Sequence, residues 1–183
     1  FSLFRGPLPC IEVHGFKGIL NSCTNFILGL MENGKTFDEA VREAQAIGIA
    51  ETDPSADIDG WDAAIKVAAL STVVLGIPLK PQQVERSSIR EITPAMIAEA
   101  RQAGERWKVV CTARRKGKEL LEASVKPQRV SAGSPLFAIN GTSSYVEFQS
   151  DVLPGLGIVE NNPGPHTTAY GLLADLINAL RGQ

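Results

Sequence analysis

An acidic loop that leads directly into an apolar helix, residues 51–66, constrains this chain more than any other segment. The loop is interrupted by proline and glycine and carries five carboxylates, Glu51, Asp53, Asp57, Asp59 and Asp62. Residues 63–75 are almost all apolar, which predicts a helix buried on every side. Lys66 stands within that helix, and a lysine is seldom fully buried without a partner. The lysine is therefore either paired and functional, or it reaches the surface near the start of the helix.

The composition is that of an ordinary soluble globular protein. The chain has 183 residues, of which 44% are hydrophobic and 21% charged, enough for one substantial core. A net charge of −2 with scattered basic residues argues against nucleic acid or a membrane surface as a partner. No run of about 18 apolar residues predicts a membrane span. Three widely spaced cysteines without a CxxC motif indicate a reducing, cytoplasmic compartment and no metal site: Cys10, Cys23 and Cys111.

Helix patterns dominate the first half of the chain and strand patterns the second. Apolar periodicity and capping residues predict helices over residues 24–33, 37–47, 61–75, 93–104 and 167–180. Alternation and turn residues predict strands over 11–20, 106–114, 118–127, 135–139, 144–150 and 156–160, with 83–91 extended. Hairpin turns are expected at residues 115–117 and 140–141. We therefore expect an α+β fold, with helices packed on one face of a mixed, largely antiparallel sheet.

Three chemistries are compatible with the acidic loop. A calcium loop of the EF-hand type, counted from Ser55, needs a glutamate at its twelfth position, where Lys66 stands. A pair of carboxylates for acid–base hydrolysis fits the spacing but leaves the lysine unexplained. The third chemistry is a cradle in which carboxylates bind an ammonium group while the lysine moves a proton.

Asp62 and Lys66 stand one helical turn apart with the acid first, which is the favourable order for an ion pair on one face. A carboxylate stabilises the charged ammonium and burial destabilises it, so the pair could exchange a proton near neutral pH. The alternative to a functional pair is an ordinary surface ion pair, in which acidic residues complement the helix dipole. Lys66 lacks an obvious polar face, and turns at Asp53 and Asp59 would direct several carboxylates at one place. Both details favour the functional interpretation.

Three motifs in this chain resemble those of the homoserine dehydrogenase family. Residues 46–66 resemble, without a gap, the family signature G-Y-x-E-x-D-P-x-x-D-[aliphatic]-x-G-x-D-x-x-x-K. Residues 18–27 resemble the family's G-I-L-N-G-T-T-N-Y-I, and residues 168–175 resemble its T-A-x-x-V-x-x-D helix. The likeness extends over roughly residues 11–180.

The resemblance implies an enzyme that interconverts L-aspartate 4-semialdehyde and L-homoserine with NADP or NAD, in threonine and methionine biosynthesis. By position, Lys66 matches the acid/base lysine that protonates the aldehyde oxygen. Asp62 matches the acid that orients this lysine and touches the substrate, an amino acid. Glu51 and Asp57 match the carboxylates that hold the substrate's ammonium group. The hydride chemistry follows from the resemblance alone.

The chain departs from the family pattern at three places. Ser22 and Cys23 replace a Gly-Thr pair, so both are candidate substrate-binding residues of an altered pocket, and we interpret Cys23 as a small packing residue. Ile49 replaces a common aromatic residue, which removes a hydroxyl contact. Residues 162–164 replace a Gly-Ala-Gly loop near the cofactor, which leaves Gly164 as the cofactor-binding candidate. These changes are also compatible with a related oxidoreductase for another amino-acid-like aldehyde.

The dinucleotide-binding pattern GxGxxG is absent, as is a strand–Gly-turn–helix unit near the start. We therefore expect a piece of a longer oxidoreductase, with the coenzyme bound mainly by a region outside this chain. Residues 1–10 are expected to form a connecting segment, and residues 11–160 a catalytic and dimerisation domain. Residues 161–183 are expected to pack on the missing nucleotide-binding domain, and exposed strands to pair two copies as a homodimer. The alternative is a non-catalytic module that binds an amino acid or dimerises.

Overall fold

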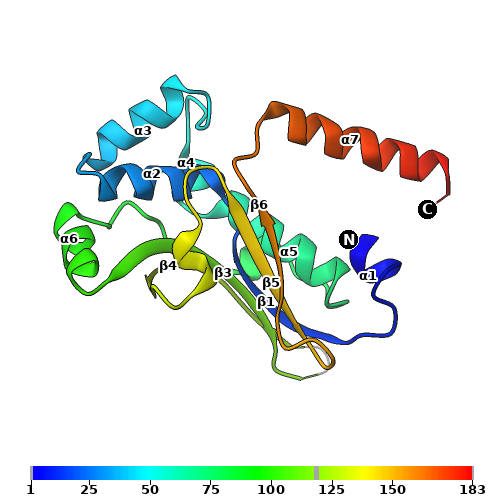
Figure 1. The fold of residues 1–183 in the computed structure, drawn as a ribbon. Coiled ribbons are helices and arrows are strands. Elements are labelled where there is room, and N and C mark those ends of the chain that lie inside the picture. Colours follow the sequence, from blue (N-terminus) through cyan, green and yellow to red (C-terminus); the bar gives the residue numbers. More distant parts are fainter. Residues whose placement is uncertain (1, 118–119, 183) are drawn as a thin grey trace.

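A six-stranded sheet forms the centre of the computed structural model, which describes residues 2–117 and 120–182 (Figure 1). The strand order is β2-β4-β3-β1-β5-β6. The pair β2–β4 is parallel, and the other neighbouring strands are antiparallel. The bounds are β1 Val13–Ile19, β2 Glu85–Arg86, β3 Glu105–Arg115, β4 Leu121–Ser131, β5 Ser144–Ser150 and β6 Leu156–Glu160. The predicted mixed, largely antiparallel sheet is confirmed.

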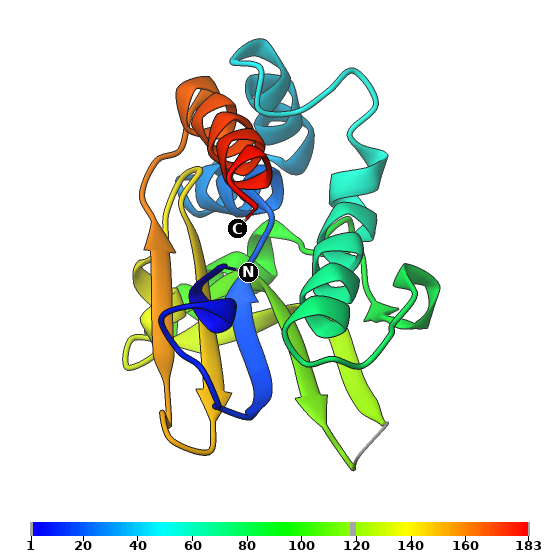
Figure 2. The ribbon, with the colours of Figure 1, turned by 90° about the vertical axis from the view of Figure 1, so that its right-hand side faces the viewer.

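Helices cover one face of this sheet and enclose the main core, as the sequence predicts. Figures 1 and 2 show α5 lying along the β3–β4 hairpin, and α2 also packs on β3. Apolar side chains of these helices meet those of the central strands, among them Ile27, Leu28, Val67, Phe16 and Cys111. The helical segments are α1 Ser2–Arg5, α2 Ser22–Glu32, α3 Phe37–Ala46, α4 Ser55–Ile58, α5 Trp61–Val73, α6 Pro94–Gln102 and α7 Pro165–Leu180, with 3-10 helices η1 Pro81–Gln83 and η2 Pro135–Ala138.

The central strand β1 leads almost directly into α2. It lies between β3 and β5, and it approaches β5 so closely that a Cβ on Gly18 would be 2.2 Å from the carbonyl oxygen of Tyr145. Only glycine fits at that position. The strand ends at Ile19, and Asn21 is already the N-cap of α2. This short connection fixes the first turn of α2 beside the middle of the sheet.

Residues 135–139 do not form a strand, which corrects the predicted hairpin around residues 140–141. Pro135 has no N–H to donate to a ladder, and it begins the 3-10 helix η2 instead. The hydroxyl of Ser134 accepts a hydrogen bond from the N–H of Leu136 and caps this turn. The buried Leu136 then packs in a second, smaller apolar cluster. Strand β5 consequently pairs with β1 and β6.

Other differences from the predicted elements are confined to short segments. Residues 83–91, expected to be extended, contribute only the two-residue strand β2. The strand predicted over residues 118–127 begins at Leu121, and its first two positions, 118–119, lie outside the described residues. The connecting segment expected over residues 1–10 contains α1, and the acidic loop contains the unpredicted short helix α4.

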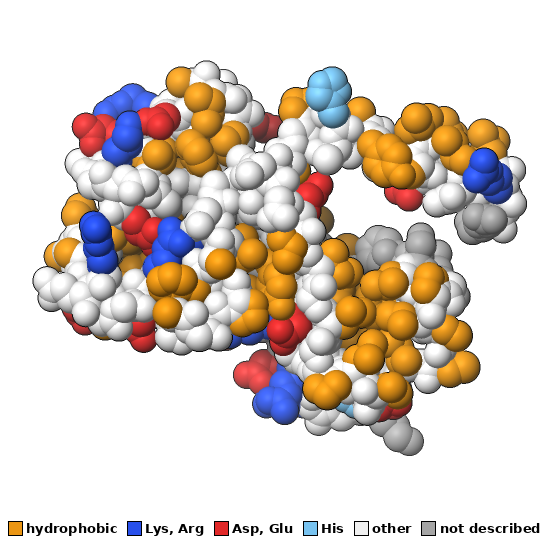
Figure 3. All heavy atoms as spheres, in the orientation of Figure 1, with side chains coloured by type: hydrophobic (Ala, Val, Ile, Leu, Met, Phe, Trp, Pro, Cys, Tyr) orange, Lys and Arg blue, Asp and Glu red, His pale blue; other side chains and the backbone are white. Residues whose placement is uncertain are grey.

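The last helix, α7, departs from this layered arrangement. Figure 1 shows it reaching away from the sheet, with a space between it and α1. None of its residues is buried, and Tyr170 and Leu180 are 73% and 80% exposed. Figure 3 shows hydrophobic side chains gathered on α7 and on the body around α1. Within the described chain, neither this helix nor any other is long and apolar enough to cross a membrane.

Candidate active site

The buried side chain of Asn21 joins two carboxylates of the acidic loop. Its Nδ2 donates to Asp57 Oδ1 over 2.6 Å and to Asp62 Oδ2 over 2.9 Å. Its Oδ1 accepts from the N–H and from the hydroxyl of Thr24, each over 2.8 Å, and so caps α2. One amide thereby connects the starts of α2 and α5 with α4, and all of its polar atoms have partners.

Lys66 pairs with Asp62 on α5, as their spacing predicts. Its Nζ lies 2.7 Å from Asp62 Oδ2 and donates to the carbonyl oxygen of Leu20 over 3.0 Å. The side chain is 48% exposed, so the expectation of a helix buried on every side is wrong in this chain. One face of α5 packs on the sheet, whereas the other, which includes Ile65, is open. The two oxygen acceptors nevertheless hold the ammonium beside the end of β1.

Two other carboxylates of the loop point elsewhere. Asp53 accepts from the N–H and hydroxyl of Ser55 and so starts α4. Asp59 forms an ion pair with Arg90 at 3.0 Å. The hydrogen bonds from Ser55 and Arg90 lower the pKa of Asp53 and of Asp59, respectively, so both are charged at neutral pH. The expectation that several carboxylates meet at one place is therefore wrong for Asp53 and Asp59, whereas Asp57 and Asp62 do meet at Asn21.

Glu51 lies exposed in the connection between α3 and α4. Gln45 Nε2 donates to its backbone carbonyl oxygen over 3.1 Å, which ties this connection to the end of α3. Among the described residues, the Glu51 side chain forms no hydrogen bond or ion pair with Asp57, Asp62 or Lys66. The structure thus brings Asp57, Asp62 and Lys66 together around Asn21 and leaves Glu51 outside this cluster.

Ser22 and Cys23 occupy the first turn of α2 but have different surroundings. Ser22 lines a hollow of about 340 Å³ together with Lys66. Cys23 is only 4% exposed. Burial, followed by the charge of Asp57, raises the pKa of the Cys23 thiol to about 12. The thiol is therefore protonated at neutral pH and is a poor nucleophile, in agreement with the packing interpretation.

The hollow beside Lys66 also contains two residues that the sequence analysis does not single out. Ser144 and Glu160 line it, and they face each other as a cross-strand pair of β5 and β6. No local pattern marks them, because they come near Lys66 only through the order of strands in the sheet. The role of Asn21 as a helix cap could be predicted from the sequence, since a polar residue before an apolar helix predicts a cap. Its hydrogen bonds to Asp57 and Asp62 could not be predicted from any local pattern.

Gly164 precedes α7 as its N-cap. Its N–H donates to the hydroxyl of Thr167 over 2.8 Å, so this amide already has a partner. One such amide does not make the cradle that the phosphates of a dinucleotide require, and the chain has no GxGxxG pattern. The residues of this chain therefore do not fit a dinucleotide on their own. Among the described His, Cys, Asp and Glu residues, no group of three or more could hold a metal ion.

The chain thus combines a lysine–carboxylate pair with a neighbouring hollow on an α+β scaffold. The family model for homoserine dehydrogenase matches residues 2–177. The NAD(+)-dependent homoserine dehydrogenase of Pseudomonas canavaninivorans is 37% identical over 167 residues, which cover 91% of this chain and 47% of that protein. The chain belongs to the homoserine dehydrogenase family, and the resemblance carried by its motifs is confirmed.

Solved structures of the same family share the fold. The homoserine dehydrogenase of Thiobacillus denitrificans matches with a TM-score of 0.89 and 30% identity, over 97% of this chain and 41% of that one. A mutant hyperthermophilic archaeal homoserine dehydrogenase in complex with NADPH matches with a TM-score of 0.74 and 30% identity, over 94% of this chain and 49% of that one. The present chain spans about half the length of the curated relatives it matches.

Proposed function

We propose that this chain is the substrate-binding and catalytic part of an enzyme that interconverts L-aspartate 4-semialdehyde and L-homoserine with NADP or NAD, in amino-acid biosynthesis. The observation that carries the proposal is the cluster of Asn21, Asp57, Asp62 and Lys66, on residues that match the family's motifs. An ammonium held by a carboxylate beside an open hollow has a proton available for a ligand.

In this proposal Lys66 is the general acid and base. It gives a proton to the aldehyde oxygen during reduction and takes it back from the alcohol during oxidation. A nicotinamide coenzyme, held mainly by a region outside this chain, would supply or accept the hydride at the carbon of the same group, so that aldehyde, hydride and proton together would give the alcohol. Asp62, 2.7 Å from Nζ, orients the ammonium and keeps it in place between turnovers.

The substrate's ammonium group would be held by Asp57 and Glu51. Asp57 is positioned by its bond from Asn21, and Glu51 is exposed, so its carboxylate is open to a ligand. Ser22 would contact the substrate from the wall of the hollow, and Cys23 would shape the site through its neighbour Asp57. The volume of about 340 Å³ is in the range of small-molecule sites and holds a four-carbon amino acid.

The exposure of helix α7 supports the proposal that this chain is part of a longer protein, in which residues 161–183 pack on a nucleotide-binding region. Proteins rarely leave a continuous apolar helix face in water unless it is an interaction surface. Gly164 would then lie at the junction with the coenzyme, which agrees with its role as the cofactor-binding candidate. The large apolar side chains exposed on this helix are Tyr170, Leu172, Leu173, Leu176, Ile177 and Leu180.

Assembly as a homodimer and a cytoplasmic location are part of the same proposal. Strand β6 is an edge of the sheet, and its Ile158 and Val159 are 42% and 47% exposed. An apolar edge strand of this kind favours pairing with a second copy. The three cysteines are free, in keeping with a reducing compartment.

The test is the oxidation of L-homoserine by the longer protein that contains this chain, with NAD and with NADP. Lys66→Ala should lower kcat about 10²- to 10⁴-fold, the usual contribution of a general acid or base. Homoserine binding, measured by calorimetry, should persist in this variant. Lys80→Ala, which removes another exposed lysine shortly after α5, is the matched control and should leave kcat unchanged.

Two outcomes would overturn the proposal. An unchanged kcat in Lys66→Ala would remove the proton-transfer role from this lysine. Binding of homoserine without turnover by the unaltered protein, with either coenzyme, would instead identify a non-catalytic amino-acid-binding module of the family.

A further inference from the structure

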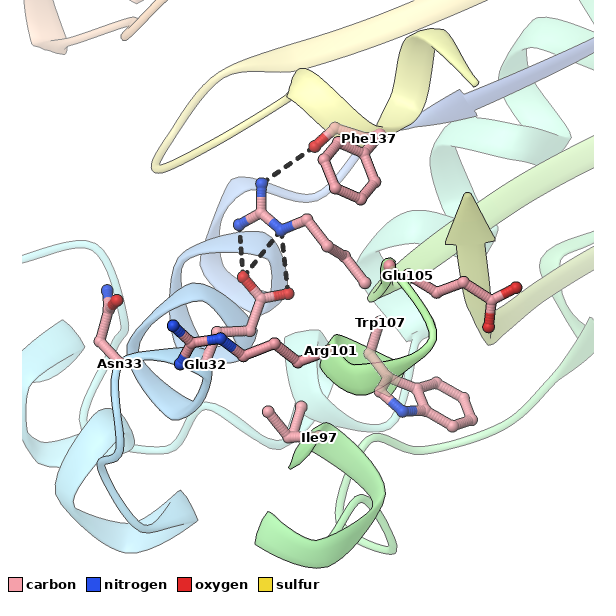
Figure 4. Close-up of a pocket in the computed structure, with 9 residues that line it drawn as sticks. Glu32, Asn33, Ile97, Arg101, Glu105, Trp107 and Phe137 are labelled. Carbon is pink, nitrogen blue, oxygen red and sulfur yellow. Dashed lines mark hydrogen bonds and ion pairs between the residues drawn. The ribbon is translucent and has the colours of Figure 1, made fainter. Parts of the chain in front are cut away.

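A second hollowed region surrounds the C-terminal end of α2 and does not include Lys66. Three hollows of about 340, 420 and 230 Å³ meet there and have Asn33 as a common lining residue. We refer to them together as the α2 C-terminal cleft. Figure 4 shows its first part, between the end of α2, helix α6, the start of β3 and η2. This cleft has no role in the function proposed above.

The carboxylates in the cleft already have partners. Glu32 forms an ion pair with Arg106, in which both side chains are largely buried. Arg106 also donates to the carbonyl oxygen of Phe137 over 2.9 Å, which fixes the guanidinium. Glu105 forms an ion pair with Arg129 at 2.5 Å, and Figure 4 shows its carboxylate directed away from Glu32. The cleft therefore offers no unpaired anion to a cationic ligand.

Two cations of the cleft, in contrast, have no carboxylate partner. The guanidinium of Arg101 forms no ion pair or hydrogen bond with any described residue, and Figure 4 shows it extending from α6 toward the end of α2. Lys108 is 1% exposed, and its ammonium donates only to neutral oxygens, Asn25 Oδ1 and the carbonyl of Ile139. Burial, and then the charge of Arg106, lowers the pKa of Lys108 to about 8. Arg101 lines the first two hollows and Lys108 the third, so an anion on Arg101 would pair with a cation that has no partner among the described residues.

Apolar side chains beside Arg101 provide a rigid wall. Ile97 is 5% exposed, and the indole N–H of Trp107 donates to the carbonyl oxygen of Met96 over 3.1 Å, which fixes the ring. Phe137 lines the same hollow from η2. A ligand with a flat apolar body could lie on this wall while its charged end contacts Arg101. A volume of about 340 Å³ is in the range of small-molecule sites.

We propose that the α2 C-terminal cleft binds a small organic anion, with its carboxylate on Arg101 and its aromatic or aliphatic body against Ile97 and Trp107. Arginine suits this role, because its planar guanidinium binds a carboxylate through two hydrogen bonds. Asn33, at the C-terminus of α2, lines the same hollow as Arg101.

The proposal can be tested with the 183-residue chain and the probe 3-phenylpropanoate. Titration followed by ¹H–¹⁵N NMR should shift the indole N–H of Trp107 and the backbone N–H groups of Asn33 and Gly104. Arg101→Gln should weaken binding about tenfold or more, because it removes a charge-assisted pair of hydrogen bonds. The matched control is Arg42→Gln, which removes an exposed arginine of α3 and should leave the affinity unchanged. The neutral amide 3-phenylpropanamide should bind at least about tenfold more weakly than the acid.

Three results would overturn this inference. Equal affinity of the acid for Arg101→Gln and for the unaltered chain would exclude Arg101 as the anchor. Equal affinity for the acid and the amide would exclude an anion site. Shifts confined to residues around Ser22 and Lys66 would show that the probe prefers the candidate active site.

Discussion

Two lysines, Lys66 and Lys108, both donate hydrogen bonds near the first turns of α2, yet their environments are opposite. Lys66 has the carboxylate of Asp62 at 2.7 Å and is 48% exposed. Lys108 is 1% exposed and has only the neutral oxygens of Asn25 and Ile139, at 2.9 and 2.5 Å. The apolar residues around a lysine therefore do not predict its burial. What decides burial is whether another element covers the face on which the lysine lies.

The largest expected difference between the two lysines is in stability. Lys108→Ala should lower the free energy of unfolding by about 2–4 kcal/mol, because it leaves a cavity and removes the donor to the buried Asn25 Oδ1. Lys66→Ala should change it by less than about 0.5 kcal/mol, because it removes an exposed ion pair. Urea denaturation of both variants measures the difference. Equal losses of stability would contradict the contrast between the two environments.

The second prediction uses the pKa of Lys108, which burial lowers from 10.5 to about 8. Below pH 8 the lysine is charged in both states, and the folded state bears the full cost of burying the charge. Between pH 8 and 10.5 the folded state releases the proton while the unfolded state keeps it, so this group's contribution to the free energy of unfolding rises with pH. Lys108→Met removes that contribution.

The measurement is the difference in free energy of unfolding between the unaltered chain and Lys108→Met, at pH values from 7 to about 10. The unaltered chain should gain stability relative to the variant as pH rises. Burial raises the thiol pKa values of Cys23 and Cys111 to about 12, so these two groups lower the stability as pH rises. Both proteins contain these cysteines, and their effect therefore cancels in the difference. A pH-independent difference would mean that Lys108 keeps its ordinary pKa.

The third prediction concerns Asn21, which bridges the carboxylates near Lys66. Asn21→Ala should lower the free energy of unfolding by about 1–3 kcal/mol, because α2 loses its cap and two carboxylates lose a common donor. Asn21→Asp retains the cap but adds a third negative charge, so it should also be destabilising at neutral pH and less so below about pH 4. Thermal unfolding at pH 7 and pH 4 distinguishes these effects. A fully stable Asn21→Ala would mean that the bridge contributes nothing to folding.

The smallest effect is expected on α7, where burial can be compared between two leucines. Leu176 is 57% exposed, whereas Leu28 of α2 is 0% exposed. In this chain Leu176→Ala should change the free energy of unfolding by less than about 0.5 kcal/mol, and Leu28→Ala should cost about 2–5 kcal/mol. In the longer protein Leu176→Ala should become clearly destabilising, if α7 packs there on a nucleotide-binding region. An effect that stays negligible in the longer protein would contradict that packing.

Much of the fold follows from local patterns in the sequence. The helix predicted over residues 37–47 begins with a capping box of Thr36 and Glu39, and the hairpin of β3 and β4 pairs over eleven residues of each strand. The prediction failed where a short apolar run had two possible structures. The pattern of residues 135–139 predicted a strand, but Ser134 and Pro135 favour a 3-10 turn. The neighbouring strands also leave no position in the sheet for this segment.

The sequence by itself determined the family and the pairing of Asp62 with Lys66, because that spacing on one helix leaves little choice of geometry. Only the tertiary structure decided that Asn21 lies between Asp57 and Asp62, that Ser144 and Glu160 reach the hollow beside Lys66, and that Lys108 is buried. These contacts join residues far apart in the chain. They depend on strand order and on which face of each helix is covered, and local periodicity does not contain that information.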